Sequence, residues 1–127
     1  MRLRDVISPT LGIRDDEPAG RTLERMRSFD IAHVIVTRGS AIHGVVSEAD
    51  LERACTTNAE GPIGDLATEV PILDSEAPIE DAAKLMRERK VGCVPVVEGD
   101  AIAGVVTIEK LLDLLGQGVV QTMRRRR

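Results

Sequence analysis

The sequence predicts a mixed α/β (α+β) fold made of two copies of a β-α-β-β-α unit. Three observations lead to this prediction. The chain aligns with itself, without a gap, when it is shifted by 60 positions. Each copy has one segment with apolar residues at helical spacing, followed by two short runs rich in β-branched residues. The length of 127 residues suits one domain, or two half-domains that share a single core.

The internal repeat is clearest around two glycines, Gly44 and Gly104, where residues 41–46 superpose on residues 101–106. Further identical residues align on either side: Asp5 with Asp65, Pro18 with Pro78, Met26 with Met86, Arg27 with Arg87, Val34 with Val94, Val36 with Val96 and Gly39 with Gly99. We therefore place the first repeat at residues 1–60, the second at residues 61–118 and a basic tail at residues 119–127.

Each repeat starts with an extended segment and a helix. Short apolar stretches at residues 10–13 and 70–73 predict the extended segments. Pro18 and Pro78 suit the first turn of a helix, where a missing N–H group costs nothing. Apolar residues follow at helical spacing: Ala19, Leu23, Met26 and Phe29 in the first repeat, and Ile79, Ala82, Ala83 and Met86 in the second.

A hairpin and a second helix complete each repeat. A β-branched run, a three-residue turn with glycine and a second run ending in Gly-Val-Val predict hairpins at residues 33–46 and 93–106. Ser47 and Thr107 stand where the second helix starts. Because a unit of about 60 residues buries only about 60% of its unfolded surface, we expect the copies to pack together with pseudo-twofold symmetry and two related clefts.

The composition is that of an ordinary globular protein, with 43% hydrophobic and 30% charged residues. No apolar run approaches the roughly 18 residues that a bilayer crossing needs, and the N-terminus lacks the apolar stretch of a signal peptide. We therefore expect a cytoplasmic protein that does not enter a membrane. Cys55 and Cys93 lie far apart, without C-x-x-C spacing, so we predict two structural thiols, no disulfide and no zinc site.

Charge and aromatic content argue against nucleic-acid binding. The net charge is −4 even though it includes the four positive charges of Arg124–Arg127. The chain has no Trp or Tyr and a single Phe, Phe29, so it lacks the aromatic residues on which single-strand binders stack bases. The Arg124–Arg127 run is typical of a solvated tail, although such runs also contact acidic lipid, RNA or a protein partner.

The duplicated unit, with hairpins that end in Gly-Val-Val-Ser and Gly-Val-Val-Thr, resembles the tandem CBS (cystathionine-β-synthase) domain pair, or Bateman module. The resemblance extends from Arg2 to Leu115 and is most specific at residues 44–50, 92–96 and 104–110. It implies a regulatory module that senses an adenine-containing nucleotide, namely AMP, ADP, ATP or an S-adenosyl compound such as S-adenosylmethionine. It also implies a homodimer whose output passes to an unknown effector protein.

The Ser47 to Asp50 segment has two interpretations. Ser-x-x-Asp is a capping box, in which the hydroxyl accepts from helix N–H groups and the acid reaches back. The same arrangement suits a nucleotide, because a helix N-terminus favours phosphate and a carboxylate accepts from two vicinal ribose hydroxyls. The family resemblance favours the second interpretation, since CBS pairs commonly bind nucleotides through these two positions.

The resemblance also implies the rest of this site. In the family, the Ser/Thr and Asp of one repeat face the first two strands of the other. Ser47 and Asp50 would then complete a cleft lined by small, mostly apolar residues: Val70, Ile72, Val91, Gly92 and Cys93. As residues of a hydrophobic core, the same side chains need no ligand.

The second cleft departs from the family pattern. Thr107 is present, but Lys110 stands where the ribose-binding acid is expected, and an ammonium group offers three donors and no acceptor. His33, which aligns with Cys93, would line this degenerate cleft. We therefore predict one competent adenosine site, although Lys110 also suits phosphate-rich ligands. The alternative is a structural, dimerising CBS module that has lost its ligand and acts through protein partners.

We find no pattern that predicts catalysis or a required cofactor. The sequence lacks a Ser/His/Asp or Cys/His arrangement and a phosphate-binding Gly-rich loop. His33 and His43 fall on neighbouring predicted strands, where two imidazoles bind metal or sense pH in some proteins. Without a carboxylate or Cys at matching spacing, we predict no metal site.

Overall fold

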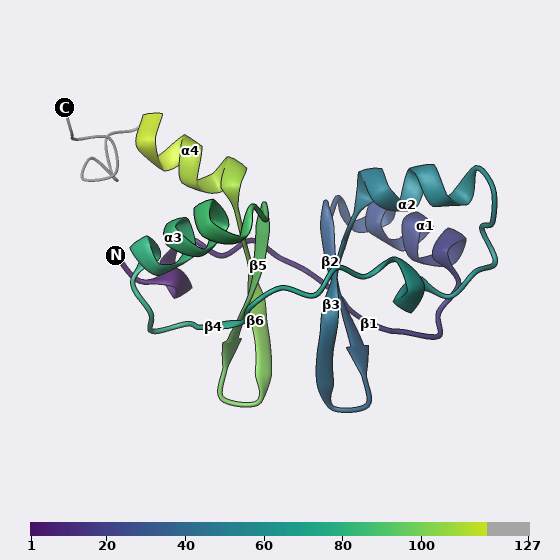
Figure 1. Ribbon diagram of the computed structural model, residues 1–127, viewed down its shortest axis with the longest axis horizontal. Helices are drawn as coiled ribbons and strands as arrows, with labels where there is room; N and C mark the ends of the chain where they lie inside the picture. Colours follow the sequence, from purple (N-terminus) through teal and green to yellow (C-terminus); the bar gives the residue numbers. More distant parts are fainter. Residues whose placement is uncertain (117–127) are drawn as a thin grey trace. The chain divides into compact units, whose positions relative to one another are not determined.

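The computed structural model describes residues 1–116, so the predicted basic tail at residues 119–127 and its Arg124–Arg127 run lie outside the described residues. The fold is mixed α+β, as predicted, and divides into two compact units (Figure 1). We call Pro9–Val70 the repeat-1 unit, and Met1–Ser8 together with the chain from Pro71 onward the repeat-2 unit. The boundaries of these units differ from those of the sequence repeats. Residues 1–8 of the first repeat belong to the repeat-2 unit, and residues 61–70 of the second repeat belong to the repeat-1 unit.

The repeat-1 unit is a three-stranded sheet with two helices and one 3₁₀ turn. Its elements are β1 (Gly12–Arg14), α1 (Ala19–Phe29), β2 (His33–Arg38), β3 (Ala41–Ser47), α2 (Glu48–Cys55) and η2 (Ile63–Leu66). The strands lie in the order β1-β2-β3, with β1 parallel to β2 and β3 antiparallel to it. The predicted extended segment, helix, hairpin and second helix are all present.

The repeat-2 unit is built in the same way. Its elements are η1 (Leu3–Asp5), β4 (Leu73–Asp74), α3 (Ile79–Arg89), β5 (Cys93–Glu98), β6 (Ala101–Thr107) and α4 (Ile108–Gly116). The strands again lie in the order β4-β5-β6, with one parallel and one antiparallel pair. Both sheets have the same irregularity in register, after Val36 in β2 and after Val96 in β5.

The first helix of each unit begins and ends alike in the two copies. Pro18 and Pro78 precede the first helical residue, in extended conformation, one position earlier than predicted. Asp30 and Lys90 end the helices in the left-handed conformation, each with a φ of 56°. A left-handed residue reverses the chain and ends helical pairing, so each helix leads directly into a strand.

The hairpin turns are two residues long, so the predicted three-residue turns are wrong by one position. Arg38 pairs with Ala41 and Glu98 with Ala101, which leaves only Gly39-Ser40 and Gly99-Asp100 unpaired. Both glycines have positive φ, 63° and 62°. Type II′ hairpins need glycine at the first turn position, where other residues are strained, and this allows the strands to pair up to the turn.

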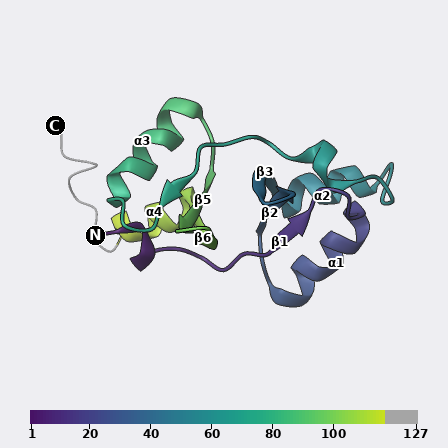
Figure 2. The same cartoon turned by 90° about the horizontal axis from the view of Figure 1, so that it is seen from below.

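Each unit is completed by the segment that precedes the other repeat. The N–H of Leu3 donates to Ala77 O at 2.9 Å, and the N–H of Ile63 donates to Glu17 O at 2.8 Å. Leu3 aligns with Ile63 and Ala77 with Glu17, so the two contacts are the same contact exchanged between copies. Figure 2 shows the N-terminal segment together with the elements of the repeat-2 unit.

The exchanged segments explain the glycine of each Gly-Val-Val motif. Thr68 and Val45 exchange two backbone hydrogen bonds, and so do Ser8 and Val105. A Cβ on Gly44 would lie 2.6 Å from Thr68 O, and one on Gly104 would lie 2.7 Å from Ser8 O. Only glycine permits the crossing segment to pass this close to the strand.

Most of the buried apolar residues form two clusters, one in each unit. The repeat-1 cluster includes Ile63 and the repeat-2 cluster includes Leu3, and both side chains are fully buried. The exchanged segment thus supplies apolar surface that a repeat of about 60 residues otherwise lacks. That contribution is the physical reason why each unit sustains its own core.

Candidate functional site

Ser47 lies at the junction between β3 and α2, where the chain changes from extended to helical. Its Oγ accepts a hydrogen bond from the backbone N–H of Asp50 at 3.1 Å, so it caps the helix. The cap uses a lone pair of the hydroxyl, and its proton remains available as a donor. Helix capping and donation to a ligand oxygen are therefore compatible roles for Ser47.

The Asp50 carboxylate lies in the first turn of α2, and its side chain is 42% exposed. It forms an ion pair with the guanidinium of Arg53, which is 71% exposed. Exposed ion pairs contribute little to stability, since solvent screens them and both side chains lose freedom. A ligand hydroxyl can therefore take the place of Arg53 at low energetic cost.

The second repeat has the same junction with a different side chain at the second position. The N–H of Lys110 donates to Thr107 Oγ1 at 3.2 Å, as Asp50 donates to Ser47. The backbone N–H of the first helical residue also has an equivalent partner in the two repeats. That of Ile108 donates to Gly92 O at 2.9 Å, and that of Glu48 donates to Ala32 O at 2.9 Å. The two junctions thus have the same backbone hydrogen bonds, whereas the side chains of Asp50 and Lys110, which stand at equivalent positions, have opposite charges.

The start of the second strand lies beside the helix start in each unit. His33 pairs with Ser47 across β2 and β3, and Cys93 pairs with Thr107 across β5 and β6. The structure therefore brings together Gly92, Cys93, Thr107 and Lys110 in the repeat-2 unit, and His33, Ser47 and Asp50 in the repeat-1 unit. The predicted grouping of Ser47 and Asp50 with Gly92 and Cys93 takes residues from both units and stays a prediction.

The apolar candidates differ in exposure. Val70, in the repeat-1 unit, is 8% exposed, whereas Ile72, in the repeat-2 unit, is 43% exposed. Val91 is half-buried and packs against the repeat-2 core, and Gly92 is exposed. Core packing therefore accounts for Val91, while Ile72 and Gly92 remain open to solvent.

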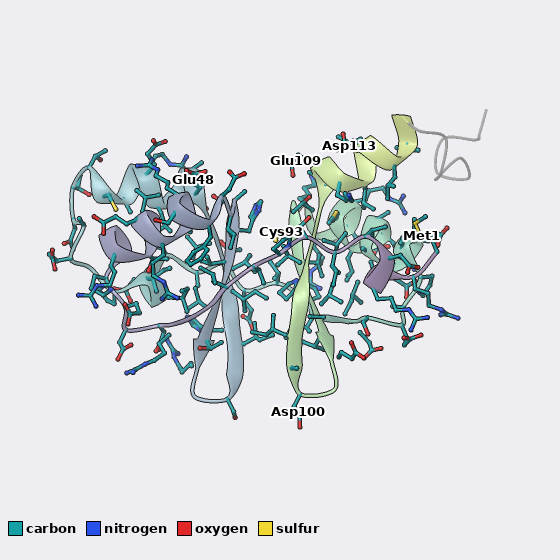
Figure 3. The ribbon with its side chains drawn as sticks, turned by 180° about the vertical axis from the view of Figure 1, so that it is seen from behind. Met1, Glu48, Cys93, Asp100, Glu109 and Asp113 are labelled. Carbon is teal, nitrogen blue, oxygen red and sulfur yellow. The ribbon has the colours of Figure 1, made fainter. Side chains whose placement is uncertain are left out.

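Cys93 is a buried thiol at the end of the repeat-2 sheet. Burial, reinforced by the negative charge of Glu109, raises its pKa from 9.0 to about 12. Figure 3 labels both residues, which lie near the start of α4. A thiol with such a pKa stays protonated at neutral pH and is a poor nucleophile, as expected for a structural residue.

Thr10 belongs to this region and was not among the predicted site residues. Its hydroxyl donates to His33 O at 2.9 Å. The signal was present in the alignment of the repeats, in which Thr10 falls on Val70. The exchange of a hydroxyl for an isopropyl group makes the two equivalent positions differ in polarity.

His43 lies in β3 apart from His33. Its Nε2 is 3.2 Å from Gly64 O and 3.4 Å from Nη2 of Arg38. Arg38 also donates to Asp15 at 2.8 Å, and this hydrogen bond holds the pKa of the Asp15 carboxyl below its ordinary value. His33 pairs with Ser47, which is four residues from His43, so the two histidine positions lie about 13 Å apart along the strand at about 3.3 Å per residue.

Within residues 1–116, no three His, Cys, Asp or Glu side chains lie close enough together to hold a metal ion. The helices of the same residues are all too short or too polar to cross a bilayer.

Comparison with known proteins identifies one family. The family model described as "CBS domain" matches twice, at residues 3–56 and 63–117. Among proteins with curated descriptions, none matches the chain significantly.

Solved structures with the same fold have sequences about one fifth identical to this chain. A putative acetoin utilization protein, AcuB, from Vibrio cholerae has a TM-score of 0.73 at 20% identity, over 100% of this chain and 98% of that one. The CBS domain pair of protein MJ0100, in complex with 5′-methylthioadenosine and S-adenosyl-L-methionine, has a TM-score of 0.77 at 20% identity, over 93% and 98%. Hypoxic Response Protein I with two coordinated zinc ions has a TM-score of 0.69 at 22% identity, over 89% and 98%.

Proposed function

The chain belongs to the CBS domain family as a tandem pair of CBS domains, and from this premise we propose that it is a regulatory module that binds an adenine-containing ligand and is not an enzyme. The proposed ligands are AMP, ADP, ATP and S-adenosylmethionine. The proposed site consists of Ser47 and Asp50 with five further residues: Val70, Ile72, Val91, Gly92 and Cys93.

The observation that carries the proposal is the pairing of a hydroxyl and an accessible carboxylate at the start of α2. The positive end of a helix favours a phosphate group, and the hydroxyl of Ser47 has a proton to donate to it. The carboxylate of Asp50 accepts from both hydroxyls of a ribose once Arg53 is displaced. These two groups suit the ribose and phosphate common to adenine nucleotides.

The other helix start supports a single adenosine site. Lys110 has no acceptor for ribose hydroxyls, although its backbone repeats that of Asp50. We propose that the region of Thr107, Lys110 and His33 does not bind adenosine. Because Asp50 and Lys110 stand at equivalent backbone positions with opposite charges, the Lys110 position serves as an internal control for any binding experiment.

One solved CBS pair supports testing this ligand class. The MJ0100 pair, which shares the fold at 20% identity, is in complex with two adenosyl compounds. That ligand set belongs to that protein, and it supports an adenosyl group as the first class of compound to test on this chain.

A second candidate function is a structural CBS module without a ligand. One observation favours it: Ser47 and Asp50 already have partners, a helix N–H and Arg53, within their own helix. Thr107 caps α4 in the same way, although Lys110 stands at the position equivalent to Asp50. Capping alone is thus sufficient to explain a hydroxyl at both positions.

We further propose that the module acts in the cytoplasm as a homodimer and passes its signal to a separate effector protein. Adenine nucleotides are cytoplasmic metabolites, and Cys55 and Cys93 are free thiols. Disulfides are rare in that reducing compartment. A ligand that binds one state of the pair shifts the equilibrium toward that state, which is how a module without catalysis transmits a signal.

The experiment is thermal unfolding of the full chain, followed by circular dichroism, with AMP, ADP, ATP or S-adenosylmethionine. A ligand at 100 times its dissociation constant stabilises the native state by about 2.7 kcal/mol, which is a visible shift for a small protein. We expect at least one compound to raise the melting temperature. Asp50→Asn should abolish that shift, whereas Lys110→Ala, the matched variant at the equivalent position, should retain it.

Two outcomes contradict the proposal. If none of the four compounds shifts the melting temperature, the structural module becomes the better account. If the shift survives Asp50→Asn but disappears in Lys110→Ala, the ligand binds at the other helix start. Equilibrium dialysis with the stabilising compound gives the stoichiometry, which we expect to be one per chain.

A further inference from the structure

One arginine, Arg27, links α1 to the beginning of α2. Its Nε donates to Glu48 Oε2 at 3.2 Å, and its Nη2 donates to Glu52 Oε2 at 2.8 Å. Glu48 and Glu52 are four residues apart, so both carboxylates lie on one side of α2 and reach the same guanidinium. All three side chains are about half exposed, and ion pairs of this kind contribute little to stability. Stability is therefore a weak reason for placing these charges together.

Glu48 stands next to the proposed ligand site. It is the first residue of α2 and directly follows Ser47; Figure 3 labels it at this position. A phosphate bound at this helix start would lie within about one helical turn, roughly 5.4 Å along the axis, of Glu48. That separation is shorter than the Debye length of about 8 Å at physiological salt, so dissolved ions screen the two charges only in part. Without a neutralising cation, Glu48 would repel the phosphate that the helix end attracts.

The beginning of α2 is strongly acidic. Glu48, Asp50 and Glu52 all fall within its first five residues. Two cations pair with these acids: Arg53 with Asp50, and Arg27 with both glutamates. In the proposed complex a ribose takes the place of Arg53 at Asp50. The arginine of α1 is then the cation that still neutralises this end of the helix.

The second repeat has the arginine but not the two glutamates. Ile108 aligns with Glu48, and Leu112 aligns with Glu52. Arg87 of α3 stands at the position equivalent to the arginine of α1. The acids and their shared cation thus occur together only beside the helix start that carries Ser47. Arg87 is accordingly the matched control for any change to the arginine of α1.

We propose that Arg27 sets the charge preference of the ligand site: it neutralises Glu48 and Glu52, so the site accepts a ligand with phosphate groups. This inference rests on the function proposed above. Arg27 acts through the two carboxylates and does not touch the ligand, so it is a positioning residue that determines specificity. Without Arg27, the uncompensated glutamates disfavour anionic ligands and favour a cation such as S-adenosylmethionine, whose sulfonium is positive.

The test is isothermal titration calorimetry of the full chain with four compounds of different charge: adenosine, AMP, ATP and S-adenosylmethionine. In Arg27→Ala we expect the dissociation constant to rise about 3-fold for AMP and about 10-fold for ATP, since each added negative charge meets the exposed glutamates. Adenosine, which is neutral, should change by less than about 2-fold, and S-adenosylmethionine should bind about 3-fold more tightly. A purely structural role for Arg27 would instead weaken all four.

Three further variants separate charge from folding. Glu48→Gln removes one negative charge and keeps the arginine, so it should tighten ATP and weaken S-adenosylmethionine. The double variant Arg27→Ala with Glu48→Gln should recover part of the lost ATP affinity, and Arg87→Ala should change neither compound. In about 1 M NaCl, where the Debye length is about 3 Å, the ratio between the ATP constants of Arg27→Ala and wild type should approach one. Circular dichroism melting of each free variant checks its fold.

Three results would overturn the proposal. If the wild type binds none of the four compounds, the proposed function fails and this inference fails with it. If binding is present and depends on Asp50, but a folded Arg27→Ala variant binds all four compounds as the wild type does or weakens them equally, only the inference fails. If Arg27→Ala does not fold, Glu48→Gln decides alone, and unchanged affinities for ATP and S-adenosylmethionine in that variant would contradict the charge effect.

Discussion

At the scale of single residues, Cys93 shows how burial controls reactivity. Its thiol is 4% exposed, and its pKa is raised to about 12. We predict that below pH 9.0 a thiol reagent such as dithionitrobenzoate modifies Cys55 in the native protein and reaches Cys93 only after unfolding in urea. Equal modification rates of the two thiols in native protein would contradict the burial of Cys93.

The same thiol makes stability depend on pH in the alkaline range. The unfolded thiol loses its proton near 9.0, whereas the folded one keeps it until about 12. The unfolded state therefore binds fewer protons between these values, and the free energy of unfolding falls as pH rises through them. Urea unfolding of wild type and Cys93→Ala across this range checks the prediction, because the variant should lose that part of the slope.

Position 44 requires glycine because another backbone segment passes close to it. A Cβ at this position lies 2.6 Å from Thr68 O, a backbone atom that cannot move aside cheaply. We predict that Gly44→Ala lowers the free energy of unfolding by about 1–3 kcal/mol, as overpacking does. Gly116→Ala, where nothing lies within 4 Å, is the matched control and should not destabilise the protein.

Lys110 tests the proposed site by gain of function. Its backbone already donates to Thr107 as that of Asp50 donates to Ser47. We expect Lys110→Asp to raise the stoichiometry of the stabilising adenine compound from one to two per chain, measured by isothermal titration calorimetry. A stoichiometry that stays at one would show that the carboxylate alone does not create the second site.

Some site residues were predictable because their chemistry is local. Ser47 and Thr107 were expected at helix starts, and both cap helices. Thr10 was missed because its partner, the carbonyl of His33, is 23 residues away. The alignment of the repeats shows that Thr10 replaces Val70, but it does not show which group the hydroxyl contacts. The two-residue turns were also missed, since glycine is compatible with both turn lengths.

At the scale of elements, the exchanged segments act as apolar plugs. Ile63 lies in η2 and is fully buried in the repeat-1 core. We predict that Ile63→Ala lowers the free energy of unfolding by about 2–5 kcal/mol, as large-to-small core changes do. Ile72→Ala is a suitable control because Ile72 is 43% exposed and should change stability little. Chemical denaturation measures both, and equal effects would mean that Ile63 does not complete the core.

The helices, strands and their order follow from periodicity, since apolar spacing depends only on local sequence. Periodicity does not predict that the two copies exchange their first segments. Leu3 and Ile63 stand at equivalent positions in the alignment, so the apolar pattern is the same whichever copy each of them contacts. Long-range docking decides the partner, and with it which apolar side chain completes each cluster.

At the scale of the whole molecule, neither sequence repeat contains all the parts of a unit. A fragment of residues 1–60 lacks Ile63, and a fragment of residues 61–127 lacks Leu3. We predict that each fragment alone is largely unfolded by circular dichroism, and that an equimolar mixture recovers the spectrum of the intact chain. A fragment that unfolds cooperatively on its own would contradict this prediction.

The exchange also orders events during synthesis. Leu3 and Val6 leave the ribosome before their partners in α3, β5 and β6, which are made up to roughly a hundred residues later. At about 5–20 residues per second, the N-terminal segment waits on the order of 5–20 s for its docking site. The repeat-1 unit can close as soon as Thr68 has emerged. The N-terminal segment is therefore among the last parts of the repeat-2 unit to fold, and the growing chain exposes its apolar side chains to chaperones throughout that interval.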